Sequence, residues 1–256
     1  MKVAINGFCG QMGQALYQKL LQDDEIKFAG GVDKINTINA KRTKDYEVAQ
    51  IFSDLNCIED CDGVIDFSHY SSLSSVLDFC IKRKIPLVIA TTGHNLIQQK
   101  QIEFASKFIP ICKSGNFSFG VQTLLKLVSI CAHLMPNADV EIVETHHNKK
   151  LDAPSGTAKM IFEEIAKQRP NSVVCVNKNR TSIKSHNEIG ISSLRGGNIV
   201  GEHKCIFFDK NECITITHNA YSRDIFATGA IKAIKFLQTK TNGLYNMQDL
   251  LENFIK

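Results

Sequence analysis

Two histidines and two lysines lie close together in the segment from Glu144 to Thr157, which reads E-T-H-H-N-K-K-L-D-A-P-S-G-T. Histidine changes its charge near neutral pH, so it can donate a proton to a bound molecule. Lysine ammonium groups and backbone N–H groups, such as those of the Ser-Gly-Thr turn, hold carboxylates. The segment therefore predicts a proton donor beside a binding site for an anion.

A second pattern with chemical meaning is the G-x-x-G-x-x-G spacing of Gly7, Gly10 and Gly13, between an apolar stretch and an amphipathic one. Glycine lets the backbone approach a diphosphate, and the N-terminus of the following helix favours its negative charge. Asp33 follows 20 residues after Gly13, where a carboxylate accepts hydrogen bonds from an adenosine ribose. We interpret the loop as a dinucleotide site, and the alternative is a tight turn with no ligand.

The residues beside Asp33 bear on the choice between NADH and NADPH. Lys34 follows it directly. The carboxylate repels a 2′-phosphate whereas the lysine attracts it, so we expect both cofactors to be accepted. Lys41 and Arg42 are interpreted as part of a solvated loop.

The first half of the chain alternates apolar strands with amphipathic helices, which is typical of a parallel sheet with helices on both faces. The polar stretch at 34–46 is interpreted as mobile. Strands are predicted at 2–6, 27–32, 64–67, 87–90 and 109–113, and helices at 11–21, 72–82 and 96–107. This order predicts a doubly wound, Rossmann-type α/β fold. The turns at 90–93 and 114–118 follow strands of that sheet, so they are expected to face the nicotinamide end of the cofactor.

After residue 117 the pattern changes to longer strands rich in β-branched residues. Helices are predicted at 121–133, 157–167 and 225–237, and strands at 140–145, 173–176, 189–195, 199–208 and 213–218. Long strands joined by short turns indicate an antiparallel or mixed open sheet. We therefore expect a second, α+β domain.

Composition excludes several classes of protein. The chain has 256 residues, of which 43% are hydrophobic, and its net charge is +4. No apolar run is long enough to span a membrane, and no basic stripe interleaved with aromatic residues indicates nucleic-acid binding. The nine cysteines are expected to be reduced in a cytoplasmic protein, and their spacing predicts no metal site.

Taken together, these motifs resemble the dihydrodipicolinate reductase family over nearly the whole chain. The matching segments are the glycine loop at 7–13, the turns at 91–93 and 116–118, the block at 146–157, R-G-G-N-I-V-G-E-H at 195–203, Ser222-Arg223 and Gly243-Leu244-Tyr245. The resemblance implies NAD(P)H-dependent reduction of dihydrodipicolinate (4-hydroxy-tetrahydrodipicolinate) to tetrahydrodipicolinate in the diaminopimelate and lysine pathway. It also implies a homotetramer, with residues 1–117 and 222–256 binding the dinucleotide and 118–221 binding substrate and forming the oligomer.

Matching positions assign roles to individual residues. His146 resembles the general acid of the family, and Lys150 the lysine that contacts substrate and assists proton transfer. The implied substrate-binding residues are His147, Gly156 and Thr157. The implied cofactor-binding residues are Gly7, Phe8, Cys9, Gly10, Gln11, Met12, Asp33, Lys34, Ala90, Thr91, Thr92, Ser114, Gly115, Asn116, Phe117 and Arg223. His203 is interpreted as a histidine that supports the sheet, and Lys149 as a solvated neighbour.

Two positions depart from the family pattern. Ala90 stands where the family commonly has glycine before Thr-Thr, and Cys9 stands where a smaller residue is often found. Neither change removes a proton-transfer group. Two other functions stay open: another two-domain dehydrogenase acting on an amino or hydroxy acid, and a regulatory protein that senses a dinucleotide without catalysis.

Overall fold

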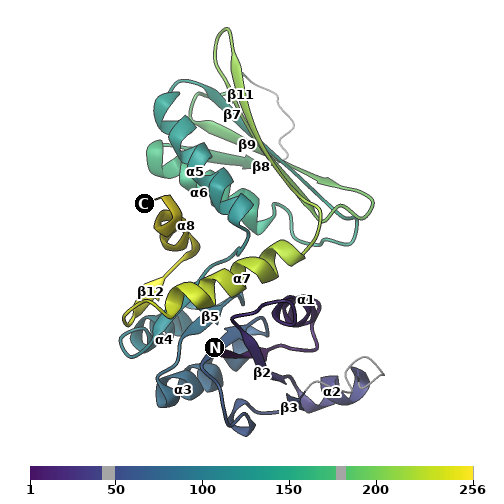
Figure 1. The fold of residues 1–256 in the computed structure, drawn as a ribbon. Coiled ribbons are helices and arrows are strands. Elements are labelled where there is room, and N and C mark those ends of the chain that lie inside the picture. The colour runs from purple at the N-terminus through teal and green to yellow at the C-terminus, as the bar shows by residue number, and fades with distance from the viewer. Residues whose placement is uncertain (42–49, 177–182, 256) are drawn as a thin grey trace. The chain divides into compact units, whose positions relative to one another are not determined.

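A computed structural model describes residues 1–41, 50–176 and 183–255. Arg42 lies outside these residues. The chain forms two compact units, of which the first comprises Met1–Ser118 with Arg223–Lys256 and the second Phe119–Ser222 (Figure 1). Two crossings of the chain therefore join the units.

The first unit contains a parallel sheet of seven strands in the order β12-β6-β5-β4-β1-β2-β3. The strands are β1 (Lys2–Asn6), β2 (Lys27–Val32), β3 (Ile51–Phe52), β4 (Gly63–Asp66), β5 (Leu87–Ile89), β6 (Pro110–Lys113) and β12 (Gly243–Tyr245). The helices are α1 (Gln11–Leu20), α2 (Ile35–Lys41), α3 (Leu73–Arg83), α4 (Leu96–Ala105), α7 (Asp224–Leu237) and α8 (Met247–Ile255), with short 3₁₀ turns at Leu55–Cys57 and Tyr70–Ser72. This arrangement confirms the predicted doubly wound sheet.

Both faces of this sheet are covered, so the central residues of its inner strands are apolar. Ala4 of β1 belongs to the core beneath α3 and α4, whereas its neighbours Val3 and Ile5 point to the opposite face. Helices α1 and α7 pack together and against strands of the same sheet. Strand ends therefore emerge between two helical layers, where a doubly wound fold binds its ligands.

Four elements were not predicted, and one of them is strand β3, which has only two residues. Helix α2 occupies residues 35–41 of the polar stretch for which no element was predicted. Strand β12 and helix α8 follow α7, which was predicted to be the last helix. β12 has only three residues and is defined by its parallel pairing with β6, and a segment this short carries no periodicity of its own.

The second unit is a mixed five-stranded sheet in the order β11-β10-β7-β9-β8, which confirms the predicted mixed sheet. Its elements are α5 (Phe119–Leu134), β7 (Asp139–His146), α6 (Gly156–Gln168), β8 (Val173–Val176), β9 (Glu188–Arg195), β10 (Gly201–Phe208) and β11 (Cys213–Ala220). β7 pairs in parallel with β9 and antiparallel with β10. Helices α5 and α6 bury one face of the sheet through a core that includes Val128, Ile161 and Phe207.

All nine cysteines are free thiols. Cys9, Cys61, Cys80, Cys112 and Cys205 are buried, and burial raises the pKa of the Cys112 thiol to about 12. None of the helices in the described ranges is long and apolar enough to cross a bilayer.

Candidate active site

The glycine loop connects β1 to α1 in a conformation that side chains would disrupt. Gly7 has a φ of +83°, and a Cβ there would lie 2.7 Å from the backbone of Ser68. A Cβ on Gly13 would lie 2.3 Å from the carbonyl oxygen of Gly7. The N–H groups of Gly7 and Phe8 donate to the carbonyl of Val32 at 2.9 and 3.1 Å. The glycines are thus required by close packing of the turn.

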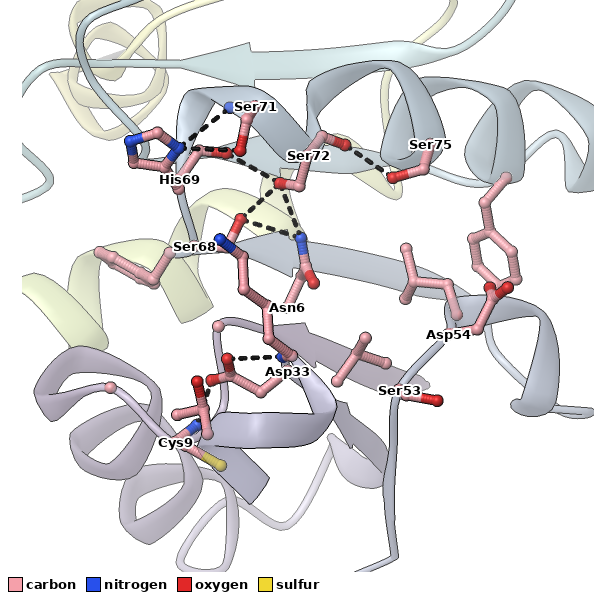
Figure 2. Close-up of a pocket in the computed structure, with 18 of the residues that line it drawn as sticks. Asn6, Cys9, Asp33, Ser53, Asp54, Ser68, His69, Ser71, Ser72 and Ser75 are labelled. Carbon is pink, nitrogen blue, oxygen red and sulfur yellow. Dashed lines mark hydrogen bonds between the residues drawn. The ribbon is translucent and has the colours of Figure 1, made fainter. Parts of the chain in front are cut away.

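A cavity of about 790 Å³ opens beside this loop, entirely within the first unit. It brings together five of the predicted cofactor residues: Gly7, Cys9, Gly10, Asp33 and Lys34. Figure 2 shows that the opposite wall comes from the segment around Ser68, His69 and Ser72, and a third side from Ser53 and Asp54. Ligand sites typically measure about 300–1,000 Å³, so the cavity has the size that a nucleotide needs.

The carboxylate of Asp33 is fixed at the edge of this cavity. Its Oδ2 accepts a hydrogen bond from the N–H of Cys9 at 2.9 Å, and its Oδ1 accepts one from the N–H of Lys34 at 2.8 Å. Each oxygen has a second lone pair to offer. The ammonium-bearing side chain of Lys34 is exposed beside it.

A polar network that sequence reasoning missed joins three strand ends behind the cavity. The buried carboxylate of Asp66 accepts from Asn6 Nδ2 at 2.9 Å, from the Ser68 N–H at 3.1 Å and from Ser68 Oγ at 2.5 Å. Thr91 Oγ1 lies 3.3 Å from its other oxygen. Burial raises the pKa of Asp66, although these hydrogen bonds oppose the shift. Asp66 thereby fixes the ends of β1, β4 and β5, and only a strand order that places β1 beside β4 reveals this role.

The remaining predicted cofactor residues of the first unit lie outside the cavity, and the structure shows contacts for several of them. Arg223 Nη1 donates to Gln11 Oε1 at 2.9 Å, so these two residues are in contact. Asn116 uses its side-chain oxygen to accept from the N–H of Ser118 at 2.8 Å, which shapes the turn after β6. The side chain of Phe8 is fully buried against Tyr17. None of the following lines the cavity: Phe8, Gln11, Met12, Ala90, Thr91, Thr92, Ser114, Gly115, Asn116, Phe117 and Arg223.

In the second unit, strand register places four ionisable side chains on the face that the helices cover. β7 pairs with β9 so that His146 lies opposite Arg195. It pairs with β10 so that Glu144 lies opposite His203. Ile142, two residues earlier on the same face, belongs to the apolar core. This face therefore changes from apolar to ionisable at the end of β7.

Glu144 is the centre of this cluster and is completely buried. Its Oε2 lies 2.5 Å from His146 Nδ1, and Arg195 donates to both carboxylate oxygens at 2.9 and 2.8 Å. Burial alone would raise the pKa of Glu144, but hydrogen bonds from Arg195 and His146 outweigh it and lower the pKa to about 2. Burial lowers the pKa of His146, opposed by Glu144 and reinforced by the charges of Lys150 and Arg195.

The Ser-Gly-Thr turn begins helix α6 next to this cluster. Ser155 donates its N–H to Glu144 Oε1 at 3.1 Å, and its Oγ accepts from the N–H of Ala158 at 3.1 Å as the N-cap. The same Oγ lies 2.9 Å from Nε2 of the buried His203. Gly156 and Thr157 form the first turn, and backbone N–H groups at a helix N-terminus favour anions.

The loop after His146 holds the other predicted residues. The N–H of His147 donates to the carbonyl of Ile199 at 2.8 Å, and the N–H of Lys150 donates to the carbonyl of His147 at 3.1 Å. Lys150 Nζ donates to Asp152 Oδ1 at 2.7 Å. The structure thus gathers His146, Lys150 and the start of α6 around one end of the mixed sheet. Across residues 1–41, 50–176 and 183–255, no group of three or more His, Cys, Asp and Glu side chains is arranged to hold a metal ion.

Comparisons with known proteins show which family the chain is similar to. The family model "Dihydrodipicolinate reductase, N-terminus" matches residues 1–117, and "Dihydrodipicolinate reductase, C-terminus" matches 120–251. The 4-hydroxy-tetrahydrodipicolinate reductase of Caldanaerobacter subterraneus subsp. tengcongensis is 44% identical over 255 residues, covering 98% of each chain. That of Clostridium tetani is 38% identical, covering 99% of this chain and 98% of its own.

Solved structures show the same likeness. A dipicolinate-bound dihydrodipicolinate reductase from Paenisporosarcina sp. TG-14 superposes with a TM-score of 0.80 at 25% identity, covering 97% of this chain and 98% of that one. A probable dehydrogenase from Thermotoga maritima shares the fold, with a TM-score of 0.64 at 11% identity, covering 98% of this chain and 92% of its own. Because both family models and full-length relatives match, the chain belongs to the dihydrodipicolinate reductase family.

Proposed function

We propose that this protein reduces 4-hydroxy-tetrahydrodipicolinate to tetrahydrodipicolinate with NAD(P)H, in the biosynthesis of diaminopimelate and lysine. The observation that carries the proposal is the cluster at the end of β7, where an imidazole backed by Glu144 lies near Lys150 and the start of α6. Full-length similarity to 4-hydroxy-tetrahydrodipicolinate reductases supports the same reaction. The dipicolinate held by the Paenisporosarcina relative is a dicarboxylate of the expected kind.

The first unit is proposed to hold the cofactor. Gly7 and Gly10 bring bare backbone to the wall of the cavity on either side of Cys9, and Asp33 offers carboxylate oxygens at its edge. NAD(P)H supplies a hydride when bound. Asp33 would accept hydrogen bonds from the adenosine ribose, and Lys34 would attract a 2′-phosphate. We therefore expect use of both NADH and NADPH, and Asp33→Ser should weaken NADH binding more than NADPH binding in a side-by-side titration.

The second unit is proposed to bind substrate and deliver the proton. Lys150 and the N–H groups of Gly156 and Thr157 would hold the carboxylates, because desolvating a dianion without partners is costly. His147 would contribute a further contact. His146 would protonate the ring carbon beside the one reduced. Two substrate carboxylates near His146 would raise its pKa, so substrate binding favours the imidazolium that the reaction needs.

The open face of the mixed sheet is proposed to form the homotetramer. Cys205 and Phe207 point into the core, so Ile206 and Phe208 lie on the opposite face of β10. Leu194 of β9 lies on that face too and is 53% exposed. Exposed apolar patches mark association surfaces. Leu194→Asp should lower the mass in sedimentation to below four chains of 28.5 kDa, whereas Ile97→Asp, at an exposed position of the first unit, should leave it unchanged.

Steady-state kinetics test the reaction and its residues. NAD(P)H oxidation should require the freshly formed condensation product of aspartate semialdehyde and pyruvate, and no stable keto acid should replace it. His146→Ala should lower kcat by about 10²- to 10⁴-fold, the usual contribution of a general acid. Lys150→Ala should lower kcat and raise KM together, and Lys149→Ala, an exposed neighbour, serves as the matched control. Unchanged constants for both His146→Ala and Lys150→Ala would refute these assignments.

A further inference from the structure

One buried carboxylate, that of Glu144, connects the proposed proton donor His146 to the start of α6. The N–H groups of α6 at Gly156 and Thr157 are the proposed binding site for a substrate carboxylate, which we call the anion cradle. Glu144 Oε2 contacts His146 Nδ1 at 2.5 Å, while its Oε1 accepts the N–H of Ser155 at 3.1 Å. Arg195 bonds to both oxygens. The proposed function uses Glu144 only as the hydrogen-bond partner of His146 and gives Arg195 no role, yet this carboxylate is completely buried.

We propose that Glu144, held by Arg195, is a positioning residue that keeps the proton of neutral His146 on Nδ1 and makes Nε2 the atom that donates to substrate. The inference rests on the proposed function in which His146 is the general acid. An ionised carboxylate accepts hydrogen bonds and donates none. Nδ1 must therefore carry a hydrogen in both the neutral and the charged imidazole, and Nε2 alone gains and loses the reacting proton.

Geometry at the other ring nitrogen agrees with this assignment. A Cβ built on Gly201 would lie 3.0 Å from His146 Nε2 and 3.4 Å from Cδ2. Glycine at this position on β10 thus leaves room beside Nε2. His203 approaches the same ring edge to face, with 5.1 Å between ring centroids. The ring is fixed by Glu144 at one nitrogen and has space beside the other.

Arg195 keeps the carboxylate charged. A guanidinium that forms two parallel hydrogen bonds with a carboxylate strongly favours its ionised form. Four ionisable groups act on His146: Glu144 stabilises its cation, whereas Lys150, Arg195 and the neighbouring His203 disfavour it. Glu144 is the only anion among these four. Its removal should lower the pKa of His146 and deprive the imidazolium of its partner.

The same carboxylate also sets the position of the cradle. Ser155 is the N-cap of α6, and Gly156 and Thr157 directly follow it. Because the N–H of Ser155 is bound to Glu144 Oε1, the start of α6 is fixed relative to His146. Loss of the carboxylate should therefore change both proton transfer, seen in kcat, and substrate binding, seen in KM.

The first test uses the wild-type protein labelled with ¹⁵N-histidine and measures the protonation of each His146 nitrogen by NMR, with His146→Ala used to assign the signals. The expected result is a neutral imidazole with hydrogen on Nδ1. A predominant Nε2–H tautomer would overturn the proposal. This readout does not depend on turnover, so it separates failure of the Glu144 assignment from failure of the proposed reaction, which His146→Ala kinetics decide.

The second test is the pH dependence of kcat/KM in Glu144→Gln. Activity that needs protonated His146 falls as pH rises through its pKa, so the variant should lose activity at a lower pH than wild type, with kcat reduced at least about 10²-fold. Glu144→Asp keeps the charge and should recover part of this loss. Glu141→Gln is the matched control, because Glu141 lies on the opposite face of β7.

A Glu144→Gln profile that superposes on the wild-type profile, with kcat unchanged, would also overturn the proposal. If Glu144→Gln does not fold, the wild-type NMR measurement and the pH profile of Glu144→Asp decide whether Glu144 positions His146. A purely structural role would lower the yield of folded protein in both variants without moving the pH at which the folded fraction loses activity.

Discussion

His203 gives the second unit a pH-dependent stability that can be calculated. Its side chain is buried beside Ser155, and its Nδ1 has no hydrogen-bond partner within the part of the chain that the structure describes. Burial, with a smaller contribution from the charge of His146, lowers the pKa of His203 from 6.5 to about 3. The folded protein therefore keeps this imidazole neutral at pH values where the unfolded chain protonates it.

The sign and size of this effect on the free energy of unfolding follow from the linkage between proton binding and unfolding. Between pH 6.5 and 3 the unfolded state binds more protons at this site, so the free energy of unfolding falls as pH falls. At pH 5 protonation stabilises the unfolded chain by about 2 kcal/mol, and at pH 7.5 by about 0.1 kcal/mol or less, if each pKa unit is worth 1.36 kcal/mol. His203→Gln cannot titrate, so it should escape about 2 kcal/mol of destabilisation between these two pH values.

Urea unfolding followed by far-UV circular dichroism measures this difference, since the chain has no tryptophan to report by fluorescence. Wild type and His203→Gln are compared at pH 7.5 and pH 5 and at one protein concentration, because oligomer stability depends on concentration. Other titrating groups make the same contribution to the free energy of unfolding in both proteins. They cancel when the change between pH 7.5 and pH 5 in wild type is compared with the change in His203→Gln. A difference between the two proteins that stays constant from pH 7.5 to 5 would show that His203 keeps its ordinary pKa in the fold, and the burial argument would be wrong.

Three further predictions concern the two candidate sites. Gly201→Ala should lower kcat with little change in thermal stability, because its methyl group would lie 3.0 Å from His146 Nε2 and fill the space beside the atom that donates the proton; normal kinetics would contradict it. Gly13→Ala should abolish dinucleotide binding measured by calorimetry, since its Cβ would lie 2.3 Å from Gly7 O, whereas Gly10→Ala, at 3.2 Å from that oxygen, should be milder. Asp66→Asn should weaken NADPH binding and lower the free energy of unfolding by about 1–3 kcal/mol, because a neutral amide oxygen accepts weaker hydrogen bonds from Asn6 and Ser68 than a carboxylate does, and its NH₂ group replaces the oxygen that accepts from Thr91; equal affinity and stability would show that the network does not support the cofactor site.

Much of the fold is predictable because its strands and helices are long enough to show their periodicity. The parallel core strands read as continuous apolar runs, and the glycine spacing specifies the first strand-turn-helix unit. The unpredicted elements depend on contacts instead. β3 has two residues and β12 three, and each is defined by pairing with a strand distant in sequence. A local pattern cannot contain that information.

In the candidate site, too, some residues can be predicted from a local pattern, whereas others depend on strand pairing. Residue types and spacing predict a proton donor in one short segment, and the family resemblance assigns that role to His146 and the assisting role to Lys150. The roles of Glu144, Arg195 and Asp66 depend on strand register and order. Arg195 lies 51 residues from Glu144 in sequence and meets it because β7 and β9 pair in parallel. Asp66 meets Asn6 because β1 and β4 are neighbours.

This dependence on register also places the proposed acid, His146, and the start of α6 around one buried carboxylate, that of Glu144. A histidine on a mobile loop would sample both tautomers and many orientations, whereas His146 is the last residue of β7 and hydrogen bonds to a carboxylate two residues earlier on the same face. The cost of burying Glu144 is offset by Arg195, the Ser155 N–H and His146 together. Replacing Arg195 should therefore lower the free energy of unfolding more than replacing an exposed arginine. The carboxylate would keep its burial while losing two charge-assisted hydrogen bonds, so the pKa of Glu144 would rise and His146 would lose part of its charged partner.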